Sequence, residues 1–209
     1  MTRIKTNISL NIFPKVDGSK IWIIDSGLEI RNNCQKGQFT NSEKTSLGNE
    51  LECTFLQVRN LFGRVSEDSD DTLWKEIYFV PNHTVEWLPK NCVCYTLVKT
   101  RSLTNLSNTV SQIISLPDVD PSNGIFRLSF IQHSSPKGDY YSLKFDWRER
   151  QNKAEDVQLI NIYDFMDTEP KLTNRLSLEL IDLDTLSMEE QSLIIQEAKS
   201  RRFQEKIEA

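Results

Sequence analysis

The sequence predicts a mainly β protein of the α+β class, in which an antiparallel sheet forms a sandwich or a barrel-like structure and a surface helix follows at the C-terminus. Short runs of alternating apolar and polar residues recur through most of the chain, with turn-forming residues between them. The length of 209 residues suits one sizeable core better than two. Beyond residue 187 the composition shifts to Glu, Gln, Lys and Arg, which favour a helix.

The expected strands are apolar or alternating runs bounded by Gly, Pro, Asn, Asp or Ser. In chain order they are residues 20–24, 28–31, 51–59, 73–80, 85–88, 92–99, 124–133, 140–148 and 156–165. The strongest hairpin signal joins residues 124–133 to 140–148, because both runs alternate and the segment between them contains Ser, Pro and Gly.

Two stretches lack such a pattern. Residues 32–49 are rich in Asn, Gln, Lys and Ser, so we expect a long exposed loop there. Residues 101–123 are rich in Ser, Thr and Asn, and we expect irregular chain, with a short helix at 110–114 as an alternative.

The chain is expected to divide into a β core domain at residues 1–167, a linker at 168–186 and a helix at 187–209. In the run Ser187-Met188-Glu189-Glu190, a serine stands three residues before a glutamate, which is a capping-box signature. We therefore expect a helix from about Met188 to about Lys206. Its apolar stripe is ragged, which suits a surface helix or one that docks on a partner.

Composition indicates a folded protein that works in the cytoplasm. Hydrophobic residues make up 38% and charged residues 26% of the chain, and the net charge is -5. A contact with nucleic acid would therefore need a local basic stripe, and the overall charge favours protein partners. No run approaches the roughly 20 apolar residues of a membrane helix, and no secretory leader is recognisable. The four cysteines are expected to be reduced thiols.

The residues that most enzymes need are scarce, so we expect a non-catalytic protein without a cofactor. The chain has only two histidines, His83 and His133, and we expect both to be solvated loop residues. With 7 glycines it forms neither a nucleophile elbow nor a phosphate-binding loop. An enzyme whose carboxylates Asp146, Glu149 and Asp164 converge in the fold stays open as an alternative.

Neither candidate metal site favours a bound ion. Cys92 and Cys94 lie two apart on an expected strand and face the same side, which suits small core residues better than a zinc site that needs four ligands. The acidic cluster at residues 67–71 lacks the spacing and the glycine of a calcium loop. We therefore expect no metal.

The segment at residues 137–153 has the composition of a surface for single-stranded RNA. Basic residues alternate there with tyrosine, phenylalanine and tryptophan, and such residues hold phosphates and stack on unpaired bases. An ordinary amphipathic strand explains the same pattern and is the simpler interpretation. With basic residues from neighbouring strands, the expected RNA contacts are Arg59, Lys99, Arg101, Tyr140, Lys144, Arg148 and Arg150.

Residues 59–63 read Arg-Asn-Leu-Phe-Gly, and an acidic loop and Leu-Trp-Lys at residues 73–75 follow. Over roughly residues 20–165 this order resembles a small accessory-protein family of type III-D CRISPR effector loci, which carries an Arg-Leu-Phe-Gly segment and then a Leu-Trp-Arg strand. Here Asn60 interrupts the Arg-Leu pair, Lys75 replaces the arginine, and the C-terminal helix is additional.

The resemblance implies a small non-catalytic subunit of an RNA-guided interference complex. Its partners would be other subunits of that complex, with guide or target RNA as a further contact and no membrane. The composition leaves a different function open, namely a free-standing β-barrel that binds a small ligand in an apolar interior.

Overall fold

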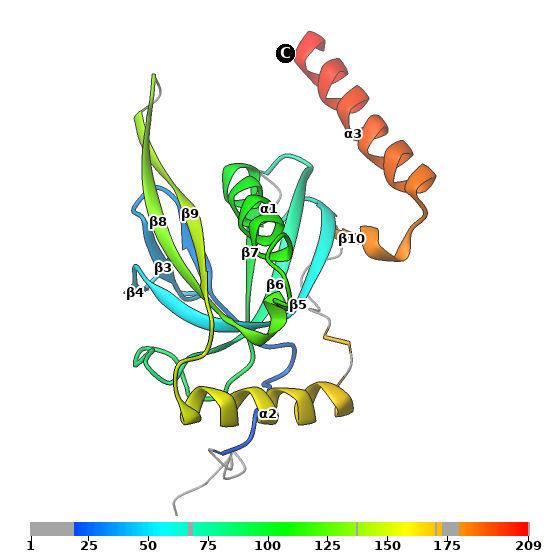
Figure 1. The fold of residues 1–209 in the computed structure, drawn as a ribbon. Helices are drawn as coiled ribbons and strands as arrows, with labels where there is room; N and C mark the ends of the chain where they lie inside the picture. Colours follow the sequence, from blue (N-terminus) through cyan, green and yellow to red (C-terminus); the bar gives the residue numbers. More distant parts are fainter. Residues whose placement is uncertain (1–18, 67–68, 137, 170, 173–179, 209) are drawn as a thin grey trace, which may run out of the picture.

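The computed structural model describes residues 19–66, 69–136, 138–169, 171–172 and 180–208. The fold is mainly β, with a seven-stranded sheet, a three-stranded sheet and a C-terminal helix (Figure 1). The strands are β1 (Leu28–Glu29), β2 (Arg31–Asn33), β3 (Gln38–Thr40), β4 (Ser46–Gly48), β5 (Leu51–Gly63), β6 (Thr72–Pro81), β7 (Cys94–Lys99), β8 (Ile125–Ser135), β9 (Gly138–Arg148) and β10 (Leu180–Asp182). The α-helices are α1 (Thr100–Ile114), α2 (Lys153–Thr168) and α3 (Met188–Glu208).

The large sheet has the strand order β1-β7-β6-β5-β8-β9, and β10 pairs with the C-terminal end of β5. The predicted mainly β fold with a C-terminal helix is confirmed. The sheet is mixed rather than wholly antiparallel, because β1 runs parallel to β7. Among the described residues β1 and β9 are its two edge strands and do not pair with each other, so the barrel-like arrangement does not close.

The sheet lies between α1 and α2 and has an apolar core on each face. On β6 the side chains alternate: Ile77 and Phe79 join the core on the α1 side, whereas Tyr78 and Val80 join the core on the α2 side. All four are fully buried. The long, bent β5 carries a register shift between Phe55 and Gln57. The sheet therefore curves around α1, as Figure 1 shows.

Helix α1 occupies the first part of the irregular chain expected at residues 101–123, and it extends well beyond the short helix considered at 110–114. Residues 115–120 are irregular, as expected. Its polar residues bind the free edge of β9. The Oγ of Ser102 accepts a hydrogen bond from the amide of Leu143 at 3.0 Å, and Asn105 Nδ2 donates to the Leu143 carbonyl at 2.7 Å. Thr109 Oγ1 donates to the Phe145 carbonyl at 2.8 Å. These contacts give poor helix formers a structural role in a helix.

Helix α2 replaces the strand expected at residues 156–165, so that prediction was wrong. Asn152 caps the helix, because its side chain accepts a hydrogen bond from the amide of Glu155 at 3.1 Å. Val157 is 46% exposed, whereas Glu155 and Gln158 are buried. Ile162 joins the apolar core on the α2 side of the sheet.

Further expectations differ from the structure, among them the strand expected at residues 20–24, where only Trp22 forms an isolated bridge, to Cys92. The loop expected at residues 32–49 contains β2, β3 and β4, which form the small sheet around the fully buried Phe39. Residues 85–88 form turns rather than a strand. Part of the expected linker 168–186 forms β10. The predictions for residues 1–18, 67–68, 137, 170 and 173–179 lie outside the described residues.

Helix α3 begins where the capping box predicted. The Ser187 amide donates to Glu190 Oε2 at 2.8 Å, and the Glu190 amide donates to Ser187 Oγ at 3.3 Å. The helix is joined to the sheet through a small apolar cluster of Phe62, Leu183 and Ala198. No helix in the described part of the chain is long and apolar enough to cross a membrane.

Candidate functional site

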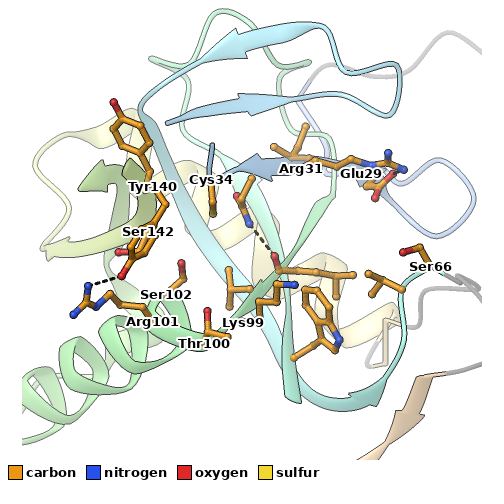
Figure 2. Close-up of a pocket in the computed structure, with 17 residues that line it drawn as sticks. Glu29, Arg31, Cys34, Ser66, Lys99, Thr100, Arg101, Ser102, Tyr140 and Ser142 are labelled. Carbon is orange, nitrogen blue, oxygen red and sulfur yellow. Dashed lines mark hydrogen bonds and ion pairs between the residues drawn. The ribbon is translucent and has the colours of Figure 1, made fainter. Parts of the chain in front are cut away.

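A pocket of about 510 Å³ lies where β7 ends and α1 begins (Figure 2). The end of β7 and the first turn of α1 form one wall, the first residues of β9 form another, and residues of β1, β2 and β6 complete it. These segments are far apart in sequence, so the fold alone assembles the pocket.

The chain passes from β7 into α1 without a loop. Lys99 is the last residue of the strand, and Thr100 has a φ of 50°, in the left-handed region that a β-branched residue rarely adopts. The N-cap residue Lys99 makes no side-chain hydrogen bond to the first turn of the helix, and that turn contains no acidic residue. The positive end of the helix dipole at this wall of the pocket is therefore not neutralised by the helix itself.

Two cations in the pocket have no ion-pair partner among the described residues. Lys99 Nζ lies 4.7 Å from the centre of the Trp74 ring, and Arg101 Nη1 donates to the Tyr140 hydroxyl at 2.8 Å. Arg31 is in contrast paired with Glu29 at 2.8 Å. The pocket therefore has a positive surplus in a protein whose net charge is -5.

Tyrosines from β9 form the wall opposite the helix. The ring of Tyr140 packs against His133 with 5.1 Å between ring centres, and His133 Nε2 lies 2.8 Å from Ser142 Oγ. His133 thus lies half-buried on β8 and is not the solvated loop residue that we expected. Tyr141 is held by the close approach of Gly37, where an added Cβ would lie 2.8 Å from its ring.

Cys34 lines the same pocket. It is a free, half-buried cysteine, and burial raises the pKa of its thiol, although nearby Lys99 opposes that shift. The reactive form of cysteine is the thiolate, so a raised pKa reduces reactivity. Burial thus lowers the reactivity that Cys34 would have as an exposed thiol.

Lys99, Arg101 and Tyr140, three of the residues expected to contact RNA, meet in this pocket. Lys144 lies further along β9, is exposed, and pairs with Asp146 at 2.6 Å. It does not line the pocket.

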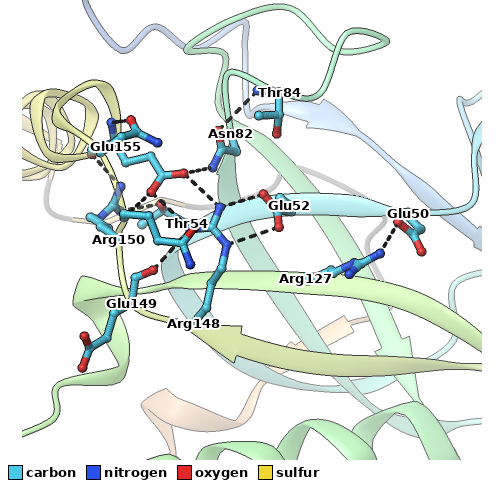
Figure 3. A network of polar contacts seen from close by, with 12 residues as sticks. Glu50, Glu52, Thr54, Asn82, Thr84, Arg127, Arg148, Glu149, Arg150 and Glu155 are labelled. Carbon is cyan, nitrogen blue, oxygen red and sulfur yellow. Dashed lines mark hydrogen bonds and ion pairs between the residues drawn. The ribbon is translucent and has the colours of Figure 1, made fainter.

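Arg148 and Arg150 lie at the other end of β9 and hold α2 against the sheet (Figure 3). Arg148 Nη2 contacts Glu52 at 2.8 Å and Glu155 at 2.9 Å. Arg150 Nη2 donates to Thr54 Oγ1 at 2.6 Å, and its Nη1 donates to the Glu155 carbonyl at 2.6 Å. With their donors engaged inside the protein, these arginines are less available for phosphates.

Arg59 is also engaged internally. Its guanidinium contacts Glu76 at 2.8 Å and Asp182 at 2.7 Å, and its side chain is only 11% exposed. Since Asp182 belongs to β10, this arginine fastens β10 to β5. An RNA contact at Arg59, Lys144, Arg148 or Arg150 stays a prediction, and these residues are not brought together with the pocket.

The described residues contain no group of three or more His, Cys, Asp or Glu side chains placed to hold a metal ion. Asp146, Glu149 and Asp164 therefore form no such site. Cys92 and Cys94 are fully buried in the core, as expected of small core residues. An enzyme that uses the three carboxylates without such a cluster stays an open alternative.

Sequence reasoning missed Trp74 and the β2–β3 turn as parts of the site. Trp74 stands in an ordinary strand pattern, and Gly37 stands in a polar stretch, so neither carries a local signal.

Comparison with family models, with curated proteins and with solved structures finds no match to this chain.

Proposed function

We propose that this protein is a non-catalytic subunit of a ribonucleoprotein complex and that it binds single-stranded RNA at the pocket of Lys99, Arg101 and Tyr140. The observation that supports this is a convergence of side chains from elements distant in sequence. An aromatic residue meets two cations for which the described residues supply no ion-pair partner. Such a combination suits a nucleotide within a flexible strand.

Each group has a defined task in this proposal. Lys99 and Arg101 attract a backbone phosphate beside the uncapped start of α1. Tyr140 offers a ring on which a base stacks, and its hydroxyl bond to Arg101 fixes both side chains in advance. The pocket volume of about 510 Å³ falls in the range of sites for small organic groups.

Membership of an RNA-guided interference complex is supported by the resemblance over residues 20–165 to an accessory family of type III-D CRISPR loci. An acidic subunit suits such an assembly, because a neighbour that carries RNA is usually basic. Purification of the tagged protein from its native lysate should recover partner proteins and RNA together. Recovery of the protein alone, as a monodisperse species, would contradict the subunit role.

RNA binding is tested by fluorescence anisotropy with a short labelled single-stranded RNA of mixed sequence. Arg101→Glu and Lys99→Gln should each weaken binding about tenfold, because each removes a phosphate contact. The logarithm of the association constant decreases as the logarithm of the salt concentration rises. For each lost phosphate contact the slope of this decrease should become shallower by about 0.7. Lys90→Glu, at the other end of the segment that leads into β7, should bind as the wild type does.

The same assay separates this function from a second candidate, the binding of a free small ligand, which the pocket's size also suits. A mononucleotide should compete only weakly if a strand is the ligand, because neighbouring phosphates add to its affinity. Equal affinity for the mononucleotide and the strand would favour the small ligand. Equal loss in the Lys90→Glu control would show that binding is not localised at the pocket.

A further inference from the structure

The outer face of α2 carries apolar side chains in a row. Val157 is 46% exposed, Ile160 is 59% exposed and Tyr163 is 49% exposed. Residues three apart on a helix lie on adjacent turns of one face, so the three side chains form a continuous patch with Ile160 at its centre. Figure 1 shows α2 lying across one end of the sheet.

The opposite side of the same helix is partly polar. Glu155 and Gln158 are buried, and each is fixed by the sheet or its loops: Glu155 binds Arg148, and Gln158 Nε2 donates to the Pro81 carbonyl at 3.0 Å. The usual distribution of polar and apolar residues is therefore reversed over the first half of α2. Exposed apolar residues in a contiguous patch are a mark of an interaction surface.

The border of the patch is acidic. Asp156, Asp164 and Asp167 are exposed on the same helix. Asp156 and Asp164 each lie four positions from Ile160 and Asp167 lies seven positions from it, so all three are on its face. Lys153 is the one basic residue among the described residues of α2. The face therefore combines an apolar centre with a negative rim.

We propose that the outer face of α2 docks a basic amphipathic segment of a partner protein, with Ile160 as the central anchor. The partner's apolar residues cover Val157, Ile160 and Tyr163, and its lysines or arginines meet the aspartates of the rim. A negative rim excludes an acidic partner and, in the same way, the phosphates of RNA. This surface is separate from the pocket at Lys99 and does not depend on the function proposed for it.

The test uses the full-length protein and a labelled designed helical peptide of leucine and lysine in amphipathic order. A peptide with glutamate at every lysine position is the control probe. Binding is measured by fluorescence anisotropy for the wild type, Ile160→Ser and Asp164→Lys. The matched control variant is Ile114→Ser, because Ile114 is equally apolar, 65% exposed, and lies on α1.

The basic peptide should bind the wild type and Ile114→Ser equally, with an affinity that falls as salt rises. Ile160→Ser should weaken it about tenfold and Asp164→Lys about fivefold, while both variants retain RNA binding. Equal binding to all variants, or equal binding of the acidic peptide, would overturn the proposal. Self-association of the wild type that Ile160→Ser abolishes in sedimentation would assign the face to a second copy instead.

Discussion

Glu155 shows how one buried carboxylate organises its surroundings. It is 1% exposed, and its oxygens accept hydrogen bonds from Arg148, from Asn82 and from the amide of Gln151. The bond from Arg148 is the main reason that the pKa of Glu155 falls to about 2. The charged form is therefore the one that the folded protein stabilises.

Glu155→Gln should lower the free energy of unfolding at neutral pH by roughly 3 kcal/mol, because it removes the buried carboxylate that pairs with the half-buried Arg148. In the wild type the folded pKa lies below that of the unfolded chain. The contribution of Glu155 is thus full above the ordinary pKa of 4.5 and is lost as the pH falls toward 2. Urea denaturation of both proteins over this range is the measurement.

The difference in stability between the wild type and Glu155→Gln should shrink as the pH falls through that window. Glu149→Gln is the control, because Glu149 is an exposed neighbour in sequence. A difference that stays constant with pH would show that the Glu155 charge is not the source of the stability.

At the scale of elements, α1 protects the edge of β9 with side chains rather than with another strand. Thr109→Val keeps the shape of the side chain but removes the hydroxyl that donates to the Phe145 carbonyl. The change should lower the free energy of unfolding by about 1 kcal/mol in urea denaturation. Thr104→Val is the matched control, because Thr104 is exposed and bonds only within its own helix. Equal effects of the two changes would contradict this role.

The predictable elements are those whose own residues carry the signal. The β8–β9 hairpin and the start of α3 were predicted because alternation and a capping box are local patterns. Helix α1 was missed because Asn105 and Thr109 are poor helix formers whose partners lie 36 to 38 residues away. In α2 the cap residue Asn152, with Glu155 three positions later, was a local signal that the alternation of apolar residues masked.

The same distinction holds for the candidate site, because some of its residues could be predicted from the sequence and others could not. Lys99, Arg101 and Tyr140 were expected from composition, since cations and aromatic residues bind RNA. The internal partners of Arg148 were beyond the sequence, because Glu52 is 96 residues away and no local pattern links the two. A basic residue on a strand binds a phosphate or a buried carboxylate equally well, and only the fold decides between them.

At the scale of the whole molecule, the pocket and the outer face of α2 lie at opposite ends of β9. Tyr140 is near the start of the strand, and Arg148, which contacts α2, is its last residue. Eight residues of extended chain span roughly 27 Å. Exposed charges at that distance are well screened at physiological salt.

RNA and the basic peptide should therefore bind independently. The double variant Arg101→Glu with Ile160→Ser should bind RNA as Arg101→Glu does and the basic peptide as Ile160→Ser does. The reason is that the free-energy effects of substitutions at distant sites add without coupling. Titration of RNA in the presence of saturating peptide measures this directly. A change in RNA affinity beyond threefold would show that the two sites communicate.

The side chains of α1 along β9 also bear on how the protein behaves at high concentration. An open strand edge is a template on which another chain can add, and this is a common route to aggregation. Because Ser102, Asn105 and Thr109 occupy that template, folding of a single copy removes it. Partial unfolding of α1 would therefore expose this edge of β9 to pairing with another chain while most of the sheet remained intact.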